Sequence, residues 1–292
     1  MAALPPDDNT YMIDIERAAE TARLIMQDRL LTAQMGGLFP EGLDTERVHD
    51  ILDLACGPGG WALDTAFHYP ECRIIGTDLS QRMTAYAEAQ AVTQRLTNIS
   101  FERMDVLQPL EFADQSFDLV NGRLLRGFMP RAAWPQVLSE CWRITRPGGI
   151  IRLTDCEPPI TTSAAFEQLK AWYIHALWKA GHSFSPDGRH GGLVQMLGRL
   201  LSTVGYQQIT HRAYAVDFSS GTAIHHEFFQ DFVVFFELLK PFCVEMGETT
   251  QEEIDRVYAQ MINERDAPNF CAVQFYLTVS GKKPEGRSPQ NP

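Results

Sequence analysis

An α/β fold built on a mostly parallel sheet is predicted by three features of this 292-residue chain. Short apolar runs alternate with helical segments between residues 48 and 157, an order typical of parallel strands joined by helices. A glycine-rich turn follows the first run, and a Gly-Gly pair precedes the fifth. Because 45% of the residues are hydrophobic, we expect one sizeable core with inserted helices.

The segment from Asp50 to Ala62 predicts a buried strand, a tight turn and the start of a helix that continues through residues 61–69. Gly57 and Gly59 can adopt positive φ and carry no Cβ, so a ligand can lie against the backbone. The unpaired amides of the helix start favour an anionic group. The segment therefore predicts half of a nucleotide-like site.

Two ligand classes fit this turn. Gly57-x-Gly59-x-x-Ala62 satisfies the dinucleotide fingerprint, and Asp78 lies at the spacing expected of a ribose-binding acid. Asp53 is not part of that pattern, and an acid four residues before the first glycine suits a ligand that carries an ammonium group.

With Asp53 and Pro58, the segment resembles motif I of the class I S-adenosylmethionine-dependent methyltransferases, D/E-x-G-x-G-x-G. Ala55 replaces the first glycine of that motif. The resemblance covers residues 48–157 and implies a Rossmann-like, seven-stranded, mostly parallel sheet with its last strand antiparallel. It also implies S-adenosyl-L-methionine as the cofactor, and the activity we expect is methyl transfer to carbon or oxygen of a small, largely apolar molecule.

The N-terminal part, residues 1–47, is expected to be a leader followed by a helix. Apolar residues recur at helical spacing between Tyr11 and Met35, and Gly36-Gly37 ends the element. This helix either packs on the domain or forms a lid, in which case position in the family would bring Tyr11 and Gln34 near the methionine end of the cofactor.

Further strands are expected at residues 73–78, 99–106, 116–121 and 150–155, because each is a short run rich in apolar residues. Ser80 is expected to cap a helix that ends near Leu96. The spacing predicts a helix over 135–144, and Arg146-Pro147-Gly148-Gly149 is expected to be the turn before the fifth strand, as in the resembled family.

The resemblance implies which residues hold the cofactor. Asp78 would accept both ribose hydroxyls, although it could also be a helix-cap acid, and Arg123 would lie near the methyl group or end in water. The full implied set is Tyr11, Gln34, Asp53, Ala55, Cys56, Gly57, Gly59, Asp78, Leu79, Met83, Met104, Asp105, Val106, Asn121, Gly122 and Arg123.

Residues 158–280 are expected to supply helical cap insertions and the closing strands, with helices over 161–181, 193–204 and 251–265 and strands over 206–218 and 271–279. Residues 281–292 are expected to be a disordered tail. Aromatic side chains concentrate in the cap and either pack in the core or line an acceptor pocket; the candidates are Trp172, Tyr173, His175, Phe228, Phe229 and Phe232.

A general base would help transfer to oxygen or nitrogen, and Glu157, His182 and His190 are the nearest candidates, without a motif behind them. No metal is expected, because His225-His226-Glu227 does not give H-E-x-x-H.

A net charge of −12 and a pI near 5.1 argue against a nucleic-acid substrate. The six cysteines form no C-x-x-C pair and no apolar run reaches about 18 residues. We therefore expect a cytoplasmic monomer or homodimer without membrane contact. Two alternatives stay open: a dinucleotide-dependent oxidoreductase, and a methyltransferase-fold protein that binds the cofactor as a cyclase or binding module.

Overall fold

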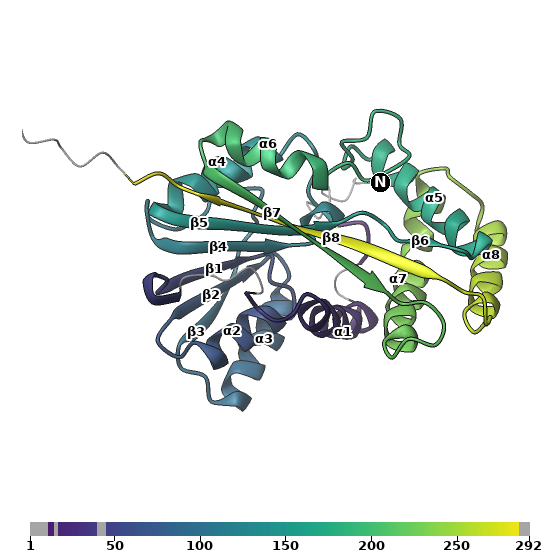
Figure 1. Ribbon diagram of the computed structural model, residues 1–292, viewed down its shortest axis with the longest axis horizontal. Helices are drawn as coiled ribbons and strands as arrows, with labels where there is room; N and C mark the ends of the chain where they lie inside the picture. The colour runs from purple at the N-terminus through teal and green to yellow at the C-terminus, as the bar shows by residue number, and fades with distance from the viewer. Residues whose placement is uncertain (1–10, 15–16, 40–44, 286–292) are drawn as a thin grey trace, which may run out of the picture.

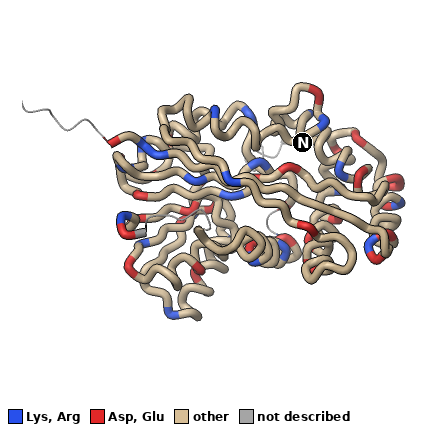
Figure 2. Tube along the Cα trace, viewed as in Figure 1, with Lys and Arg blue, Asp and Glu red and all other residues tan. Residues whose placement is uncertain are grey.

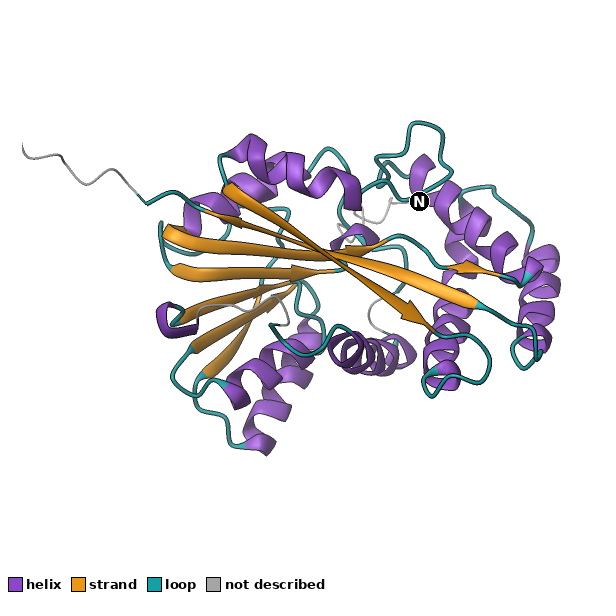
Figure 3. Ribbon diagram, in the orientation of Figure 1, coloured by secondary structure: helices purple, strands orange, loops and turns teal. Residues whose placement is uncertain are grey.

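The structure, a computed structural model, describes residues 11–14, 17–39 and 45–285. Within them, eight strands form one sheet in the order β3-β2-β1-β4-β5-β8-β6, and β7 pairs with β8 (Figures 1 and 3). The strands are β1 (Asp50–Leu54), β2 (Arg73–Asp78), β3 (Ile99–Arg103), β4 (Phe117–Arg123), β5 (Thr145–Cys156), β6 (Ile160–Thr161), β7 (Gln207–Asp217) and β8 (Ala272–Lys282).

The described helices are α1 (Ala18–Gln34), α2 (Gly60–His68), α3 (Gln81–Gln94), α4 (Trp134–Ile144), α5 (Ala164–Lys179), α6 (Val194–Val204), α7 (His225–Glu245) and α8 (Gln251–Glu264), with short 3-10 helices η1 (Thr45–Arg47) and η2 (Leu125–Gly127). Strands β1 to β5 run parallel, and β8 runs antiparallel to β5, β6 and β7. The predicted α/β class and the antiparallel closing strand are therefore confirmed. The two-residue β6 was not predicted.

The central strands β1, β2, β4 and β5 are mostly buried, which explains their near-continuous apolar runs. In β1, Ile51 packs with Trp61 of α2 on one face, whereas Leu52 and Leu54 pack with α4 and α6 on the other. This alternation is the two-residue period of a strand. The polar residues that come directly after the buried part of each parallel strand therefore lie at the carboxyl edge of the sheet.

Helices α5, α7 and α8 pack together beyond the carboxyl ends of the parallel strands and form the cap (Figure 3). Their buried aromatic side chains form a separate core with residues of α1 and β8. Ser163 caps α5 by accepting a hydrogen bond from the amide of Phe166 at 3.0 Å, and Thr250 caps α8 in the same way. The cap and α1 together enclose the sheet edge.

Arg146-Pro147-Gly148-Gly149 lies inside β5 as an irregularity, not before the strand as predicted. Thr145 pairs with Phe117 and Ile150 pairs with Leu119, so the four residues between them loop out of the ladder. Gly148 has a φ of 82°, which favours glycine. Arg146 then contacts Asp50 at 2.7 Å and Asp118 at 2.8 Å, and so links the starts of β1 and β4.

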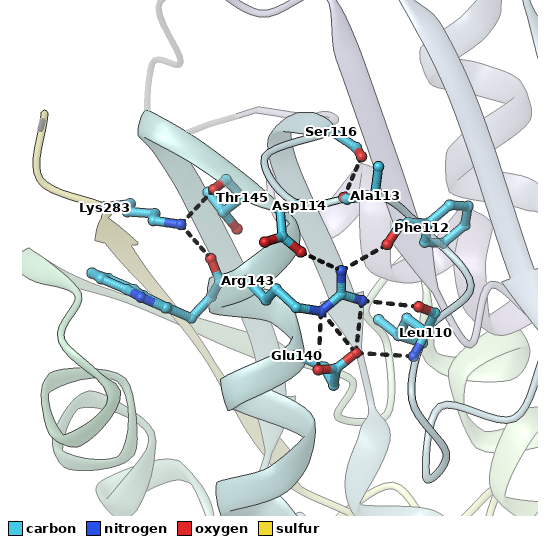
Figure 4. Close-up of polar contacts among 10 residues, drawn as sticks. Leu110, Phe112, Ala113, Asp114, Ser116, Glu140, Arg143, Thr145 and Lys283 are labelled. Atoms are coloured by element: carbon cyan, nitrogen blue, oxygen red, sulfur yellow. Dashed lines mark hydrogen bonds and ion pairs between the residues drawn. The ribbon is translucent and has the colours of Figure 1, made fainter.

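Arg143, at the end of α4, fixes the loop that precedes β4 (Figure 4). Its Nη1 donates to the carbonyl of Phe112 at 2.7 Å, and its Nη2 donates to the carbonyl of Leu110 at 2.9 Å. Glu140 orients the guanidinium with bonds of 2.8–3.2 Å. Five planar donors suit this bridging role.

Strand β8 continues to Lys282, three residues beyond the predicted end, and Gly281 pairs with Ile151 of β5. Gly281 and Lys282, which were predicted to begin a disordered tail, therefore belong to the sheet, and residues 286–292 lie outside the described part. Acidic and basic positions are interspersed along the trace (Figure 2). In the described part of the chain, no helix combines the length and the apolar character needed to cross a membrane.

Candidate functional site

A pocket lies at the carboxyl ends of the parallel strands, between the sheet, α1 and the cap. Because the sheet order is β3-β2-β1-β4-β5-β8, the pocket extends from the end of β2 and β3 to β8. The residues that line it include Tyr11, Arg23, Leu24, Gln27, Asp28, Asp53, Ala55, Cys56, Gly57, Asp78, Leu79, Met104, Asp105, Val106, Arg123, Arg126, Asp155, Cys156, Lys170, Tyr173, Asp231, Phe232, Phe235, Phe236, Gln274 and Tyr276.

Asp78 organises the end of the pocket near β2. Its Oδ2 accepts a hydrogen bond from the amide of Gly57 at 2.9 Å, and its Oδ1 accepts one from the amide of Ser80 at 2.9 Å. Gly57 has a φ of 55°, a conformation that L residues adopt at a cost. The carboxylate therefore joins the glycine turn to the start of α3 while it lines the pocket.

Asp53 lies beside the turn, 3% exposed, at the end of a buried polar chain. Asn121 donates to its Oδ1 at 2.7 Å, and Arg152 donates to Asn121 Oδ1 at 2.9 Å. Burial raises the pKa of Asp53 to about 7, against the opposing effects of Asn121 and Arg152. A cationic ligand group beside this carboxylate would stabilise its charged form.

A second acid faces the start of α2. The carboxylate of Asp28 lies so close to Gly60 that a Cβ at that position would collide with it, and its Oδ2 is buried without a hydrogen-bond partner among the described residues. Its Oδ1 pairs with Arg123, which also donates to Thr32 at 3.1 Å. A carboxylate at a helix N-terminus repels a diphosphate and attracts an ammonium group.

Helix α1 is joined to α7 across the pocket by a buried ionic cluster. Arg23 contacts Glu20 at 2.7 Å and Asp231 at 3.1 Å. Gln27 donates to Asp231 at 3.2 Å, and the Tyr11 hydroxyl donates to Glu20 at 2.6 Å. Burial raises the pKa of Asp231, although the charge of Arg23 opposes this shift. The cluster holds α1 as one wall of the pocket.

The end of the pocket near β5 and β8 combines aromatic walls with a buried polar group. Phe232, Phe235 and Phe236 of α7 and Tyr173 of α5 line this region, and the rings of Tyr173 and Phe235 contact each other edge to face, with centroids 5.2 Å apart. Arg126 of η2 contributes a buried guanidinium. This end can enclose a ring-shaped apolar molecule that carries a polar substituent.

The structure brings together most of the residues predicted to hold a cofactor. Four predicted residues lie close by without lining the pocket: Gly59 packs against Ala87 and Phe101, Met83 is buried in the core, and Asn121 and Gly122 lie beneath the surface. Gln34 lies at the exposed end of α1, and Gln27 and Asp28, two turns earlier, line the pocket instead.

Of the predicted aromatic wall, Tyr173 and Phe232 line the pocket. Trp172, Phe228 and Phe229 are buried in the cap core, as the alternative interpretation had it. His175 is bonded to Glu248 at 2.7 Å on the outside of the cap. Phe235 and Phe236 were not singled out, because a helix so rich in aromatics does not reveal which face meets a cavity.

None of the three predicted bases lines this pocket. Glu157 accepts hydrogen bonds from the amides of Gly191 and Gly192 at 2.7 and 2.8 Å, and so fixes a loop. His182 lies 3.4 Å from the carbonyl oxygen of Arg126, and burial lowers its pKa. His190 contributes its carbonyl to Ser183. The buried carboxylate of Asp155, missed in the sequence, lies in the pocket wall instead.

Among the described residues, His225, His226 and Asp266 are grouped with a spacing that could hold a metal ion. Both ring nitrogens of His225 already contact carbonyl oxygens, of Phe218 at 2.8 Å and Arg265 at 3.1 Å. His225, the buried member of the group, therefore has no ring nitrogen left to bind a metal ion.

The methyltransferase domain family matches residues 51–149. The chain is 36% identical over 132 residues to a demethylmenaquinone methyltransferase of Deinococcus radiodurans, covering 45% of this chain and 52% of the relative. It is 32% identical over 101 residues to a trans-aconitate 2-methyltransferase of the same organism, covering 35% of each. The chain thus spans about half or less of the length of these relatives.

Among solved structures, a phosphoethanolamine N-methyltransferase 2 of Haemonchus contortus, in complex with S-adenosylhomocysteine, matches with a TM-score of 0.54. The match has 17% sequence identity and covers 91% of this chain and 57% of the other. This similarity concerns the fold.

Proposed function

We propose that this chain, whose residues 51–149 match the methyltransferase domain family, transfers the methyl group of S-adenosyl-L-methionine to a carbon or oxygen atom of a small, largely apolar molecule. The observation that carries this proposal is the row of acids along one pocket: Asp28 and Asp53 beside the turn, then Asp78 and Asp105. Such a row suits a ligand with an ammonium group, two ribose hydroxyls and an adenine amino group.

The sheet order orients the ligand within the pocket. Asp105 and Val106, which follow β3, would bind the adenine, and Asp78 would accept the ribose hydroxyls. Asp53 and the free Oδ2 of Asp28 would accept the ammonium group. A dinucleotide fits less well, because its diphosphate would meet Asp28 at the start of α2.

The cap end of the pocket would hold the acceptor. Phe232, Phe235 and Tyr173 offer apolar faces, which favour a flat hydrophobic molecule and stabilise positive charge that develops nearby. The bound cofactor supplies an electrophilic methyl group. The protein's part is to hold the acceptor atom in line with it, to exclude water under α1, and to place Asp155 where it can take a proton from an oxygen acceptor.

A labelled-methyl assay tests the proposal. The purified full chain is incubated with methyl-labelled S-adenosyl-L-methionine and a small-molecule extract, and label should enter an organic-soluble product. Asp78→Ala should abolish the incorporation, whereas Asp64→Ala, which changes an exposed residue of α2, should not. If the protein binds S-adenosylhomocysteine but transfers label to no acceptor, the transfer proposal is wrong. The protein would then be a binding or cyclising protein.

A further inference from the structure

Arg126 is a buried cation in the acceptor end of the pocket, with only 5% of its surface exposed. Its Nε and Nη1 have no hydrogen-bond acceptor among the described residues. The carboxylate paired with it, Glu157, lies 3.9 Å from Nη1, too far for a hydrogen bond. Both oxygens of Glu157 already accept backbone amides.

The other basic side chains that line the described pocket are partnered. Arg23 bonds to Glu20 and Asp231, and Arg123 bonds to Asp28 and Thr32. Lys170 donates to the carbonyl of Pro159 at 2.9 Å and pairs with Glu167. Arg126 therefore differs from its neighbours in keeping donors that the protein leaves unused.

Among the polar groups close to Arg126, Tyr173 makes a side-chain hydrogen bond with it, which leaves Nε and Nη1 without an acceptor among the described residues. Asp155 Oδ2 accepts the backbone amide of Arg126 at 3.2 Å, and its Oδ1 accepts the amide of Cys156 at 2.8 Å. The Tyr276 hydroxyl donates to Gln274 at 3.0 Å. Burial lowers the pKa of Arg126, but the acidic groups around it outweigh that effect and the net shift is upward. The guanidinium therefore stays charged.

The position of Arg126 is also fixed by its packing. Gly191 lies so close to Nη1 that a Cβ at residue 191 would collide with it. Glu157 holds that glycine and Gly192 in place through their amides. A charged, buried and immobilised guanidinium with unused donors is costly unless a ligand supplies acceptor atoms.

We propose that Arg126 binds an anionic oxygen of the methyl acceptor, either a carboxylate or an ionised hydroxyl carried on an aromatic ring. This inference rests on the proposed function. It narrows the acceptor class from small, largely apolar molecules to aromatic molecules that carry one anionic oxygen group. The aromatic walls of α7 and Tyr173 contact the ring, and Arg126 sets its orientation toward the methyl group.

Ligand binding to the full chain saturated with S-adenosylhomocysteine tests this role. The probes are 2-naphthoate, its neutral analogue 2-naphthamide, and 2-naphthol titrated through its ionisation, each measured by calorimetry. The wild type should bind 2-naphthoate, or ionised 2-naphthol, about tenfold or more tightly than 2-naphthamide. Which of the two anions binds more tightly identifies the source of the oxygen.

Arg126→Met should reduce the preference for the anion to less than about threefold while 2-naphthamide and S-adenosylhomocysteine bind as before. Arg126→Lys, which keeps the charge but not the planar donors, should retain a weakened preference, so the test survives if the methionine variant folds poorly. Arg199→Met, at an exposed position of α6, should behave as the wild type.

Equal affinity of the wild type for 2-naphthoate, ionised 2-naphthol and 2-naphthamide would overturn the inference, and so would an unchanged preference in folded Arg126→Met. The proposed function fails separately, if the wild type does not bind S-adenosylhomocysteine. Retained cofactor binding without an anion preference removes the role of Arg126 alone.

Discussion

Asp78 serves two purposes with one carboxylate, because it accepts the amides of Gly57 and Ser80 and also lines the pocket. Asp78→Asn keeps one side-chain acceptor oxygen but removes the charge. We expect it to weaken S-adenosylhomocysteine binding by tenfold or more, since hydrogen bonds to a charged group contribute about 1.5–3 kcal/mol each. Calorimetry measures the loss, with Asp64→Asn on α2 as the matched control.

Asp78→Ala removes both acceptors and should lower the melting temperature more than Asp78→Asn does, because the glycine turn loses its anchor. If folded Asp78→Asn binds the ligand as tightly as the wild type, Asp78 only caps the turn and α3.

Asp53 should make cofactor binding depend on pH. Its buried carboxyl has a pKa raised to about 7, so in the free protein its contribution to stability is present below pH 4 and is lost as the pH rises to about 7. The charged form is the one that attracts an ammonium group. S-adenosylhomocysteine should therefore bind more tightly as the pH rises from 5.5 to 7.5.

Asp53→Asn should flatten this pH profile in calorimetric titrations, because its amide does not ionise in this range. A wild-type affinity that does not change across the range, or a variant with the same slope as the wild type, would show that Asp53 does not meet the ammonium group.

At the level of elements, α1 buries an ionic cluster as well as apolar residues. Arg23→Met would leave Glu20 and Asp231 buried without their partner. We expect a loss of about 3–5 kcal/mol in the free energy of unfolding, or detachment of α1 from α7. Urea denaturation measures the first and protease sensitivity within α1 the second.

The matched control is Arg29→Met on the exposed side of the same helix, which should change stability by less than about 0.5 kcal/mol. A similarly small effect of Arg23→Met would mean that α1 is held by its apolar residues alone.

The core elements were predictable because each strand is a short apolar run and Ser80 is a recognisable cap, which accepts the amide of Met83. The face of α1 was not, since Glu20, Thr21 and Arg23 are among its buried residues and a hydrophobic pattern assigns such residues to solvent. For the same reason Gln34 was predicted to lie near the cofactor, whereas the residues of α1 that line the pocket include Gln27 and Asp28, about two turns earlier.

Likewise, the sequence of α7 predicted an aromatic wall but not its facing residues. Phe229 is fully buried in the core while Phe235 lines the pocket. The phenylalanine that meets the cavity is decided by how α7 packs against α1 and α5. Helices α1 and α7 are roughly 200 residues apart in the sequence, as the pairing of Arg23 with Asp231 shows, so a local pattern does not reveal this packing.

For the whole molecule, the sheet order converts separate motifs into one elongated site. The acids after β1, β2 and β3 line one end, whereas Arg126, Asp155 and Tyr276 line the other. Only the fold brings Arg126 of η2 beside Tyr173 of α5, so the acceptor end was out of reach of motif-based reasoning.

This pocket should bind the methionine-derived cofactor and not a dinucleotide. Calorimetric titration of the full chain with S-adenosylhomocysteine and, separately, with NAD tests it most directly. The row of acids and the carboxylate of Asp28 at the start of α2 predict micromolar binding, about −8 kcal/mol, for S-adenosylhomocysteine and no measurable binding for NAD. Micromolar binding of NAD, with none for S-adenosylhomocysteine, would instead make this a dinucleotide site.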